Sequence, residues 1–214
     1  MFDPYFGGDA RHIFAALAVS LSCLAYLPLL RDVLGGNSQP QRTSWLIWSV
    51  LSAISFASQV SEGATASLWF AGIQSGGTIT IFMLSLSRGT GGWMNTRDAL
   101  ILAAACCGLG LWYATDNAVW ALAISCGISL LGGTVTIAKA YADPSSETMV
   151  FWGLSLCAAT FALGSVGAYD PVLLMYPAYL FVLNAGIVSA MLLGRRRDRI
   201  KTPAQHAPTG LTPA

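Results

Sequence analysis

Seven apolar stretches, each about as long as the roughly 20 residues that cross the hydrocarbon core of a bilayer, dominate this chain. Only 10% of the residues are charged, whereas a soluble domain has about 25%. We therefore predict an all-α membrane protein with seven transmembrane helices rather than a soluble domain. The predicted helices cover residues 13–30, 44–61, 65–87, 99–115, 118–138, 148–168 and 171–194.

The positions of the basic residues predict the orientation of these helices. Seven crossings place ten of the 11 Lys and Arg residues on one side, and Arg11 alone on the other. Basic residues accumulate on the cytoplasmic side of a membrane. We therefore expect a plasma (inner) membrane protein with its N-terminus outside and its C-terminus in the cytoplasm. Asp3 and Asp9 replace the basic start of a signal peptide, so we expect the first helix to be retained.

Two parts of the chain repeat one pattern. Pro40 precedes Trp48 by eight residues, and Pro144 precedes Trp152 by the same spacing. A hydroxyl residue lies four positions before each Trp, and a cation closes the preceding helix in both parts. This pattern predicts two copies of one three-helix unit.

The helix count then predicts a 3+1+3 organisation. The first unit covers residues 1–88, the second covers 117–194, and residues 89–116 link them through helix 99–115. One extra crossing makes the two units parallel, and transporters built from parallel repeats bind substrate near the midplane between the repeats. We expect residues 195–214 to form a basic, disordered cytoplasmic tail.

Polar residues within the apolar stretches are the candidates for a solute site, because polar groups in hydrocarbon must be paired or line a cavity. Asn184 and Gln74 lead, since an amide offers both donors and acceptors, although helix packing is an equal alternative for Asn184. Ser75 and Thr78 are further candidates, with helix packing as the alternative. Pro28 interrupts a helix and predicts either a hinge or a static kink.

Trp48 and Trp152 lie about one turn into their helices, at matching points of the two units. Rings related by the repeat would face each other across a central path and stack on a sugar or a flat heterocycle. A position in the aromatic belt at the membrane interface is the alternative.

Several segments resemble the SWEET and PQ-loop superfamily, which includes bacterial SemiSWEET half-units and the PnuC vitamin transporters. Tyr26-Leu27-Pro28-Leu29 lies where the PQ motif is expected, with Leu29 in place of Gln. The segments 43–48 and 139–144 are similar to those of bacterial members, and Asn184-Ala185-Gly186 resembles the pocket-facing Asn of SWEET proteins. The resemblance implies the 3+1+3 fold, with the N-terminus outside.

The candidate residues form a substrate-binding set and a hinge or gate set. The candidate substrate-binding residues are Asn184, Gln74, Ser75, Thr78, Trp48 and Trp152. The second unit carries Val135-Thr136-Ile137 without a Pro. The candidate hinge or gate residues are therefore Pro28, Thr136, Pro40 and Pro144.

The apolar stretches contain no Asp, Glu, Lys, Arg or His. Proton-coupled carriers need an ionisable relay in the membrane, and hydrolases need a base or metal ligands, so we expect no enzyme, no metal and no cofactor. The sequence predicts a facilitator that passes a small neutral solute, a sugar or vitamin-like molecule, across the lipid bilayer by alternating access. It predicts no nucleic-acid partner and leaves a homo-oligomer open. A non-transporting membrane subunit or adaptor of a larger complex is the alternative, and a ligand-sensing receptor is a weaker third.

Overall fold

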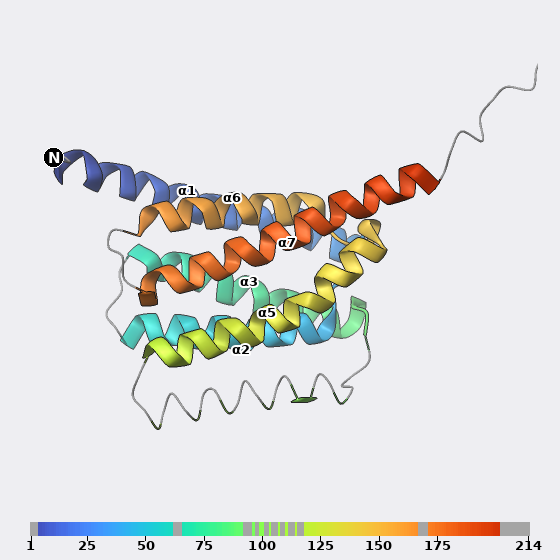
Figure 1. Cartoon of the computed structure of the whole chain (residues 1–214), viewed down its shortest axis with the longest axis horizontal. Helices are drawn as coiled ribbons and strands as arrows, with labels where there is room; N and C mark the ends of the chain where they lie inside the picture. The colour runs from blue at the N-terminus through green and yellow to red at the C-terminus, as the bar shows by residue number, and fades with distance from the viewer. Residues whose placement is uncertain are drawn as a thin grey trace, which may run out of the picture.

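The computed structural model describes residues 4–61, 66–91, 96, 99–100, 103, 107, 110, 114, 118–166 and 171–201. These residues are helical and contain no β-strand, so the predicted all-α class is confirmed. The helices run side by side along one common direction (Figure 1). They are α1 (Pro4–Gly35), α2 (Arg42–Ser61), α3 (Ala66–Arg88), α5 (Ala118–Ala142), the 3₁₀-helix η1 (Pro144–Ser146), α6 (Met149–Ser165) and α7 (Pro171–Lys201).

Four of the described helices are long and apolar enough to cross a membrane, and they are α1, α3, α5 and α7. The two other described α-helices fall short for different reasons. α6 is apolar but has only 17 residues, which gives about 25 Å against a hydrocarbon core of about 30 Å. α2 has 20 residues but is rich in serine, and Ser49, Ser52 and Ser55 are buried inside the bundle. The predicted helix 99–115 lies largely outside the described residues.

The helix at the C-terminal end extends further than predicted. Residues 195–201, expected in a disordered tail, continue α7 as helix, while 202–214 lie outside the described residues. Gly194 allows a close approach to the end of α5, because a Cβ there would lie 2.5 Å from the carbonyl oxygen of Tyr141. Arg197 Nη2 donates to the carbonyl oxygen of Ala142 at 3.0 Å. These contacts hold the basic segment against the bundle, so the prediction of disorder was wrong for this part.

The helix contacts divide into two matching triplets, α1–α2–α3 and α5–α6–α7. In the first triplet α3 contacts both α1 and α2, and in the second α7 contacts both α5 and α6. Between the triplets α1 packs on α6 and α2 packs on α5. Exchanging the first triplet for the second, helix by helix, leaves this set of contacts unchanged.

Two hydrogen bonds between the triplets follow the same relation. Thr136 Oγ1 of α5 donates to Ser44 Oγ of α2 at 3.0 Å. Thr148 Oγ1, just before α6, donates to Asp32 Oδ2 of α1 at 2.9 Å. The same number of positions separates Asp32 from Thr136 and Ser44 from Thr148. Equivalent positions therefore make equivalent bonds across the interface between the triplets.

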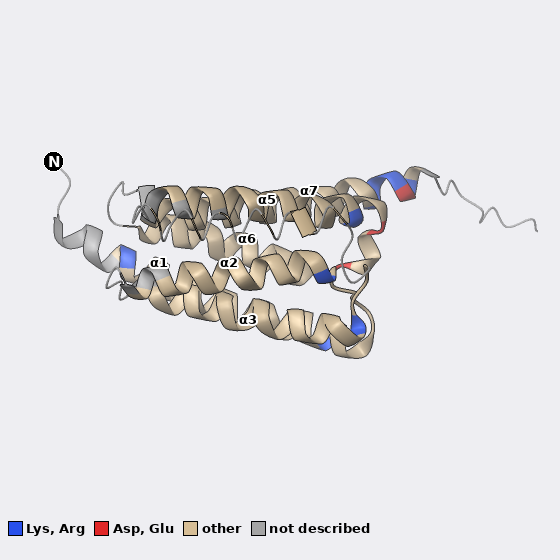
Figure 2. Ribbon diagram, turned by 90° about the horizontal axis from the view of Figure 1, so that it is seen from below, with Lys and Arg blue, Asp and Glu red and all other residues tan. Residues whose placement is uncertain are grey.

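Most of the Lys and Arg residues in the described part of the chain gather at one end of the bundle (Figure 2). This end, called the basic end below, holds the C-terminal ends of α1, α3, α5 and α7 and the N-terminal ends of α2 and α6. Cations suit C-terminal helix ends, whose carbonyl groups carry partial negative charge. Arg88 Nη1, for example, donates to the carbonyl oxygen of Leu34 near the end of α1.

Adjacent glycines in α3 test the contact between α1 and α3. A Cβ at Gly77 would lie 2.1 Å from Cζ of the buried Tyr26 ring, whereas a Cβ at Gly76 would have nothing within 4 Å. We expect G77A to lower the free energy of unfolding by about 1–3 kcal/mol through overpacking. G76A, the matched control, should keep the stability or raise it by up to about 1 kcal/mol, because alanine favours helix. Thermal unfolding in detergent, followed by tryptophan fluorescence, measures both, and equal melting temperatures would contradict the described contact.

Candidate functional site

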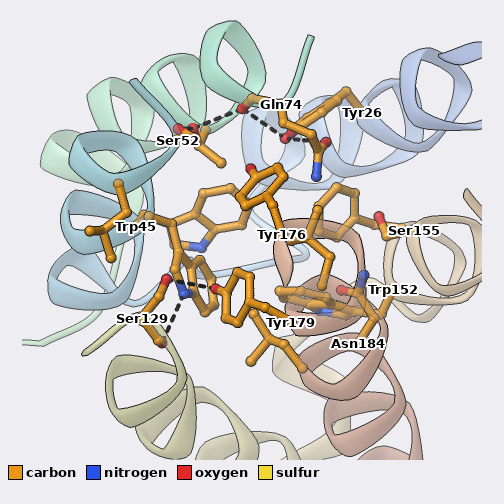
Figure 3. A pocket seen from close by; sticks show the side chains of 16 residues that line it. Tyr26, Trp45, Ser52, Gln74, Ser129, Trp152, Ser155, Tyr176, Tyr179 and Asn184 are labelled. Atoms are coloured by element: carbon orange, nitrogen blue, oxygen red, sulfur yellow. Dashed lines mark hydrogen bonds between the residues drawn. The ribbon is translucent and has the colours of Figure 1, made fainter. Parts of the chain in front are cut away.

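A cavity lies between the two triplets, and all six described α-helices contribute side chains to its wall (Figure 3). Its volume, measured as the space open to the centres of water molecules, is about 40 Å³. One water needs roughly 10–15 Å³ on this measure. The cavity therefore has room for a few water molecules in this conformation, and a larger solute requires the walls to move apart.

Aromatic rings form the wall of this cavity nearest the N-terminal ends of α2 and α6. The rings of Trp48 and Trp152 meet edge to face, with centroids 5.8 Å apart and planes at 73°. Trp45 meets Trp48 in the same way at 5.3 Å, and Phe151 meets Trp152 at 4.7 Å. Such pairs contribute about 0.5–1.5 kcal/mol each beyond their area burial. The rings thus hold α2 and α6 together across the interface between the triplets.

The burial of the tryptophan pair bears on the aromatic-belt alternative. Trp48 is 6% exposed and Trp152 is 3% exposed, and both line the cavity. The aromatic-belt interpretation was therefore wrong for this pair. Trp69 and Trp120, by contrast, are 74% and 67% exposed, as residues at a membrane surface are.

Most polar groups of the wall bond to one another. Tyr26 Oη donates to Gln74 Oε1 at 3.3 Å. The hydroxyl groups of Ser52 and Thr78 are 2.7 Å apart, and Thr78 Oγ1 also donates to the carbonyl oxygen of Gln74 at 2.8 Å. On the other triplet, Ser129 Oγ lies 2.6 Å from the hydroxyl of Tyr179. These bonds order the wall and leave few of its polar groups free for a ligand.

Asn184 is the exception. Its side chain is 3% exposed, and its Nδ2 is the buried side-chain nitrogen or oxygen without a hydrogen-bond partner among the described residues. A buried donor without a partner costs about 1–3 kcal/mol, and native structures contain few such groups. Asn184 lines the cavity (Figure 3). A ligand or a water that accepts from Nδ2 would recover this cost.

The structure brings five of the six candidate substrate-binding residues around one cavity, and they are Asn184, Gln74, Thr78, Trp48 and Trp152. Ser75 is buried but does not line the cavity. Its carbonyl oxygen accepts from Thr78 Oγ1 at 3.1 Å instead. The structure therefore does not bring Ser75 to the cavity wall.

The candidate hinge or gate residues lie away from the cavity wall. Pro28 is half-buried within the continuous helix α1. Pro40 and Pro144 are buried in the segments before α2 and α6, at the basic end, and Thr136 joins α5 to α2. These positions all belong to contacts between or beside the triplets.

Sequence reasoning missed several residues of the wall, notably the aromatic ones. Trp45, Tyr26, Phe151, Tyr176 and Tyr179 all line the cavity. A signal for two of them existed in α7, where a single helical face carries residues 176, 179, 180, 183 and 184. The apolar residues all round α7 masked this face, because a tyrosine next to leucine gives no contrast in hydropathy.

The residues that line the cavity include no carboxylate, imidazole, amine or thiol group. They offer aromatic faces, hydroxyl groups and two amides. Among the described residues, no group of three or more His, Cys, Asp or Glu side chains is placed to hold a metal ion. Aromatic and apolar side chains with a few polar groups are the usual composition of a wall that binds a small molecule.

One buried carboxylate lies just outside the wall. Glu147, between η1 and α6, accepts from Trp152 Nε1 at 3.0 Å and from Lys139 Nζ at 3.0 Å. Burial raises the pKa of this carboxyl above its ordinary value, and Lys139 and Trp152 offset part of that shift. The sequence analysis did not single out Glu147, because nothing in its neighbours along the chain indicates that it is buried.

The chain matches no protein-family model, no curated protein and no solved structure. The geometry of the cavity therefore carries the functional argument.

The two amides of the cavity wall make a paired test. N184L removes a buried donor that has no partner, so we expect the ligand-free protein to gain about 1–3 kcal/mol in free energy of unfolding. Q74L removes the acceptor of the Tyr26 hydroxyl, and we expect it to lose about 1 kcal/mol. Chemical unfolding in detergent micelles compares the two, and a loss of stability in N184L as large as that in Q74L would show that Asn184 is bonded.

Proposed function

We propose that this protein is a SWEET-like membrane transporter that facilitates the passage of a small neutral solute by alternating access. The observation that carries the proposal is the unpaired Nδ2 of Asn184 at the wall of a cavity between two matching helix triplets. Sites that bind small molecules combine apolar and aromatic walls with a few polar groups that orient the ligand. Binding sites often retain groups that cost stability in the empty protein, because ligand binding repays the cost.

The wall supports a particular class of solute. Asn184 Nδ2 requires an acceptor, such as a hydroxyl, a carbonyl or a ring nitrogen. The tryptophan pair offers edges and faces to a flat or ring-shaped molecule. Because the wall carries no charged side chain, a charged solute would lose its hydration without an opposite charge to replace it. These features favour a sugar or a vitamin-like heterocycle.

The size of the cavity supports movement of the two triplets during transport. The described conformation leaves room for a few waters only, so the solute enters after the walls separate. The contacts that cross the interface are those of α1 with α6 and of α2 with α5. Motion of one triplet against the other would open the cavity while the contacts inside each triplet stay intact, as in other transporters built from repeats.

The proposal includes a seven-helix, 3+1+3 membrane topology with two parallel units at 1–88 and 117–194. The matching contacts of the two triplets support it. Helix 99–115 would be the linker that makes the units parallel, and the bundle would surround the serine-rich α2 and the short α6. The basic end would face the cytoplasm of a plasma (inner) membrane, with the N-terminus outside.

The adaptor alternative expects an apolar, filled centre. A cavity with an unpaired amide nitrogen argues against the adaptor alternative. A buried polar group without a partner lowers stability, and an adaptor has no ligand that would offset this loss.

Uptake into proteoliposomes tests the transport proposal. We expect saturable uptake of at least one member of a panel of radiolabelled sugars, nucleosides and vitamins. N184A should reduce that uptake about tenfold, which corresponds to one lost hydrogen bond of about 1.4 kcal/mol. S189A, on the exposed side of the same helix, is the matched control and should transport normally. If the whole panel gives no protein-dependent uptake, the protein is not a facilitator of this class.

Labelling of single cysteines tests the orientation. A cysteine introduced at Ser87, exposed at the C-terminal end of α3, should react with a membrane-impermeant maleimide only from the cytoplasmic side. A cysteine introduced at Arg11, at the opposite end of α1, should react only from outside. Reaction of both cysteines from one side would exclude the proposed topology.

A further inference from the structure

The carboxylate of Glu147 belongs to no part of the solute site, yet it bonds directly to one wall of it. Its side chain is 2% exposed, and that of its partner Lys139 is 19% exposed. One oxygen accepts from Lys139 Nζ and the other from Trp152 Nε1, each at 3.0 Å. Trp152 in turn meets Trp48 edge to face and lines the cavity. A single carboxylate therefore connects a cation near water with the aromatic wall.

Glu147 also lies within the set of bonds that closes the basic end between the triplets. On one side of it in the chain, the carbonyl oxygen of Ser146 accepts from Gln39 N at 3.3 Å and from Ser38 Oγ at 3.4 Å. On the other side, Thr148 Oγ1 donates to Asp32 Oδ2. Lys139 Nζ donates to the carbonyl oxygen of Gln39 as well. We call these contacts the clasp.

Separation of the triplets at the basic end would break the clasp and admit water to Glu147. The residues before and after Glu147 both bond to the first triplet, so movement of that triplet would uncover the segment that carries Glu147. We call the described arrangement, with the clasp intact, the closed form, and the arrangement with the triplets separated at the basic end the open form. The carboxyl of Glu147 is shielded from water in the closed form and exposed to water in the open form.

The charge of Glu147 then favours one form over the other. An ionised carboxylate loses several kcal/mol of hydration on burial, and one cation and one N–H group recover only part of it. The neutral acid loses much less. The raised pKa of Glu147 in the closed form has burial as its main cause, in agreement with this balance. The form with the higher pKa binds the proton more tightly, so protonation stabilises closure and ionisation favours opening.

The positions of the other charged groups near the clasp determine how each affects the ionisation of Glu147. Lys139 of α5 stabilises the ionised carboxylate, and Asp143, exposed before η1, opposes it weakly. Asp32 of α1 reaches the site through Thr148. Arg197 of α7 is directed to the carbonyl oxygen of Ala142 and to the ring of Tyr141.

We propose that Glu147 is a proton-binding site that controls the clasp, so that uptake of a proton at the basic end keeps the cavity closed on that side and its release permits opening. The proton comes from and returns to the water at the basic end, beside the partly exposed Lys139. Its effect on flux rests on the proposed transport function, whereas the opening itself can be measured without a solute.

Accessibility of the cavity tests the proposal in the full chain. The five cysteines are replaced by alanine, and S155C places a reporter thiol on the cavity wall. In sealed vesicles whose basic end faces outward, the rate of modification by the impermeant reagent sulfonatoethyl methanethiosulfonate is measured between pH 5.5 and 8.5. The same rates in an E147Q background are the reference, which cancels the pH dependence of the thiol itself.

We expect the rate with Glu147, divided by the rate with E147Q, to rise up to about tenfold across this range for each unit of pKa difference between the two forms. D143N is the matched control. Because the charge of Asp143 opposes the ionisation of Glu147 only weakly, its removal should keep the rise in accessibility and move it only slightly, to lower pH. The carboxylate of Asp143 is exposed, and its hydrogen bonds with Ser145 lower its pKa, so it stays ionised throughout.

K139Q gives a second readout that does not depend on the E147Q protein. Loss of the cation raises the pKa of Glu147, so the rise in accessibility should move to higher pH. If neither E147Q nor K139Q changes the pH profile of the modification rate, the proposal is overturned, even if the protein transports a solute. If the pH profile depends on Glu147 but the protein transports no solute, the proposed role of Glu147 in the clasp is supported and the proposed transport function is refuted.

Discussion

The contact between Trp48 and Trp152 is the interaction on which the centre of this molecule depends. It joins α2 of one triplet to α6 of the other, and both rings are buried inside the bundle. Trp45 and Phe151 extend it into a layer of four rings. The ring quadrupole favours these edge-to-face contacts. The cavity lies beside the rings and is also lined by polar groups from α3, α5 and α7.

The cavity wall shows two ways of handling polar groups in an apolar bundle. Most hydroxyl groups are bonded to one another or to a carbonyl oxygen of the preceding helical turn, as Thr78 and Ser52 are. These bonds make a serine-rich helix such as α2 tolerable inside the bundle. Asn184 Nδ2 has no such partner. The unpaired group stands out because the rest of the wall is so well bonded.

Sequence reasoning found the helices and five residues of the cavity wall, and its failures have physical causes. It found Trp48 and Trp152 from the repeated spacing, and Asn184 as an amide within an apolar stretch. Both signals can be read directly from the order of residues in the chain. It missed Tyr176 and Tyr179, since their helix is apolar all round and hydropathy cannot show which face is inside. It also excluded ionisable groups from the membrane-spanning stretches, which is correct along the chain. The structure nevertheless brings the carboxylate of Glu147 from the adjacent segment to a ring that lines the cavity.

The sequence by itself determined the all-helical class, the approximate places of the six described α-helices and the gathering of basic residues at one end. These properties follow from local hydrophobicity and from the cost of placing a charge in hydrocarbon, which act residue by residue. Only the tertiary structure decided that Trp48 meets Trp152, that Asn184 lacks a partner, that Glu147 is buried and that residues 195–201 continue α7. These outcomes depend on contacts between helices far apart in the chain. Such contacts are set by the fit of side-chain shapes, which a linear pattern of polarity does not contain.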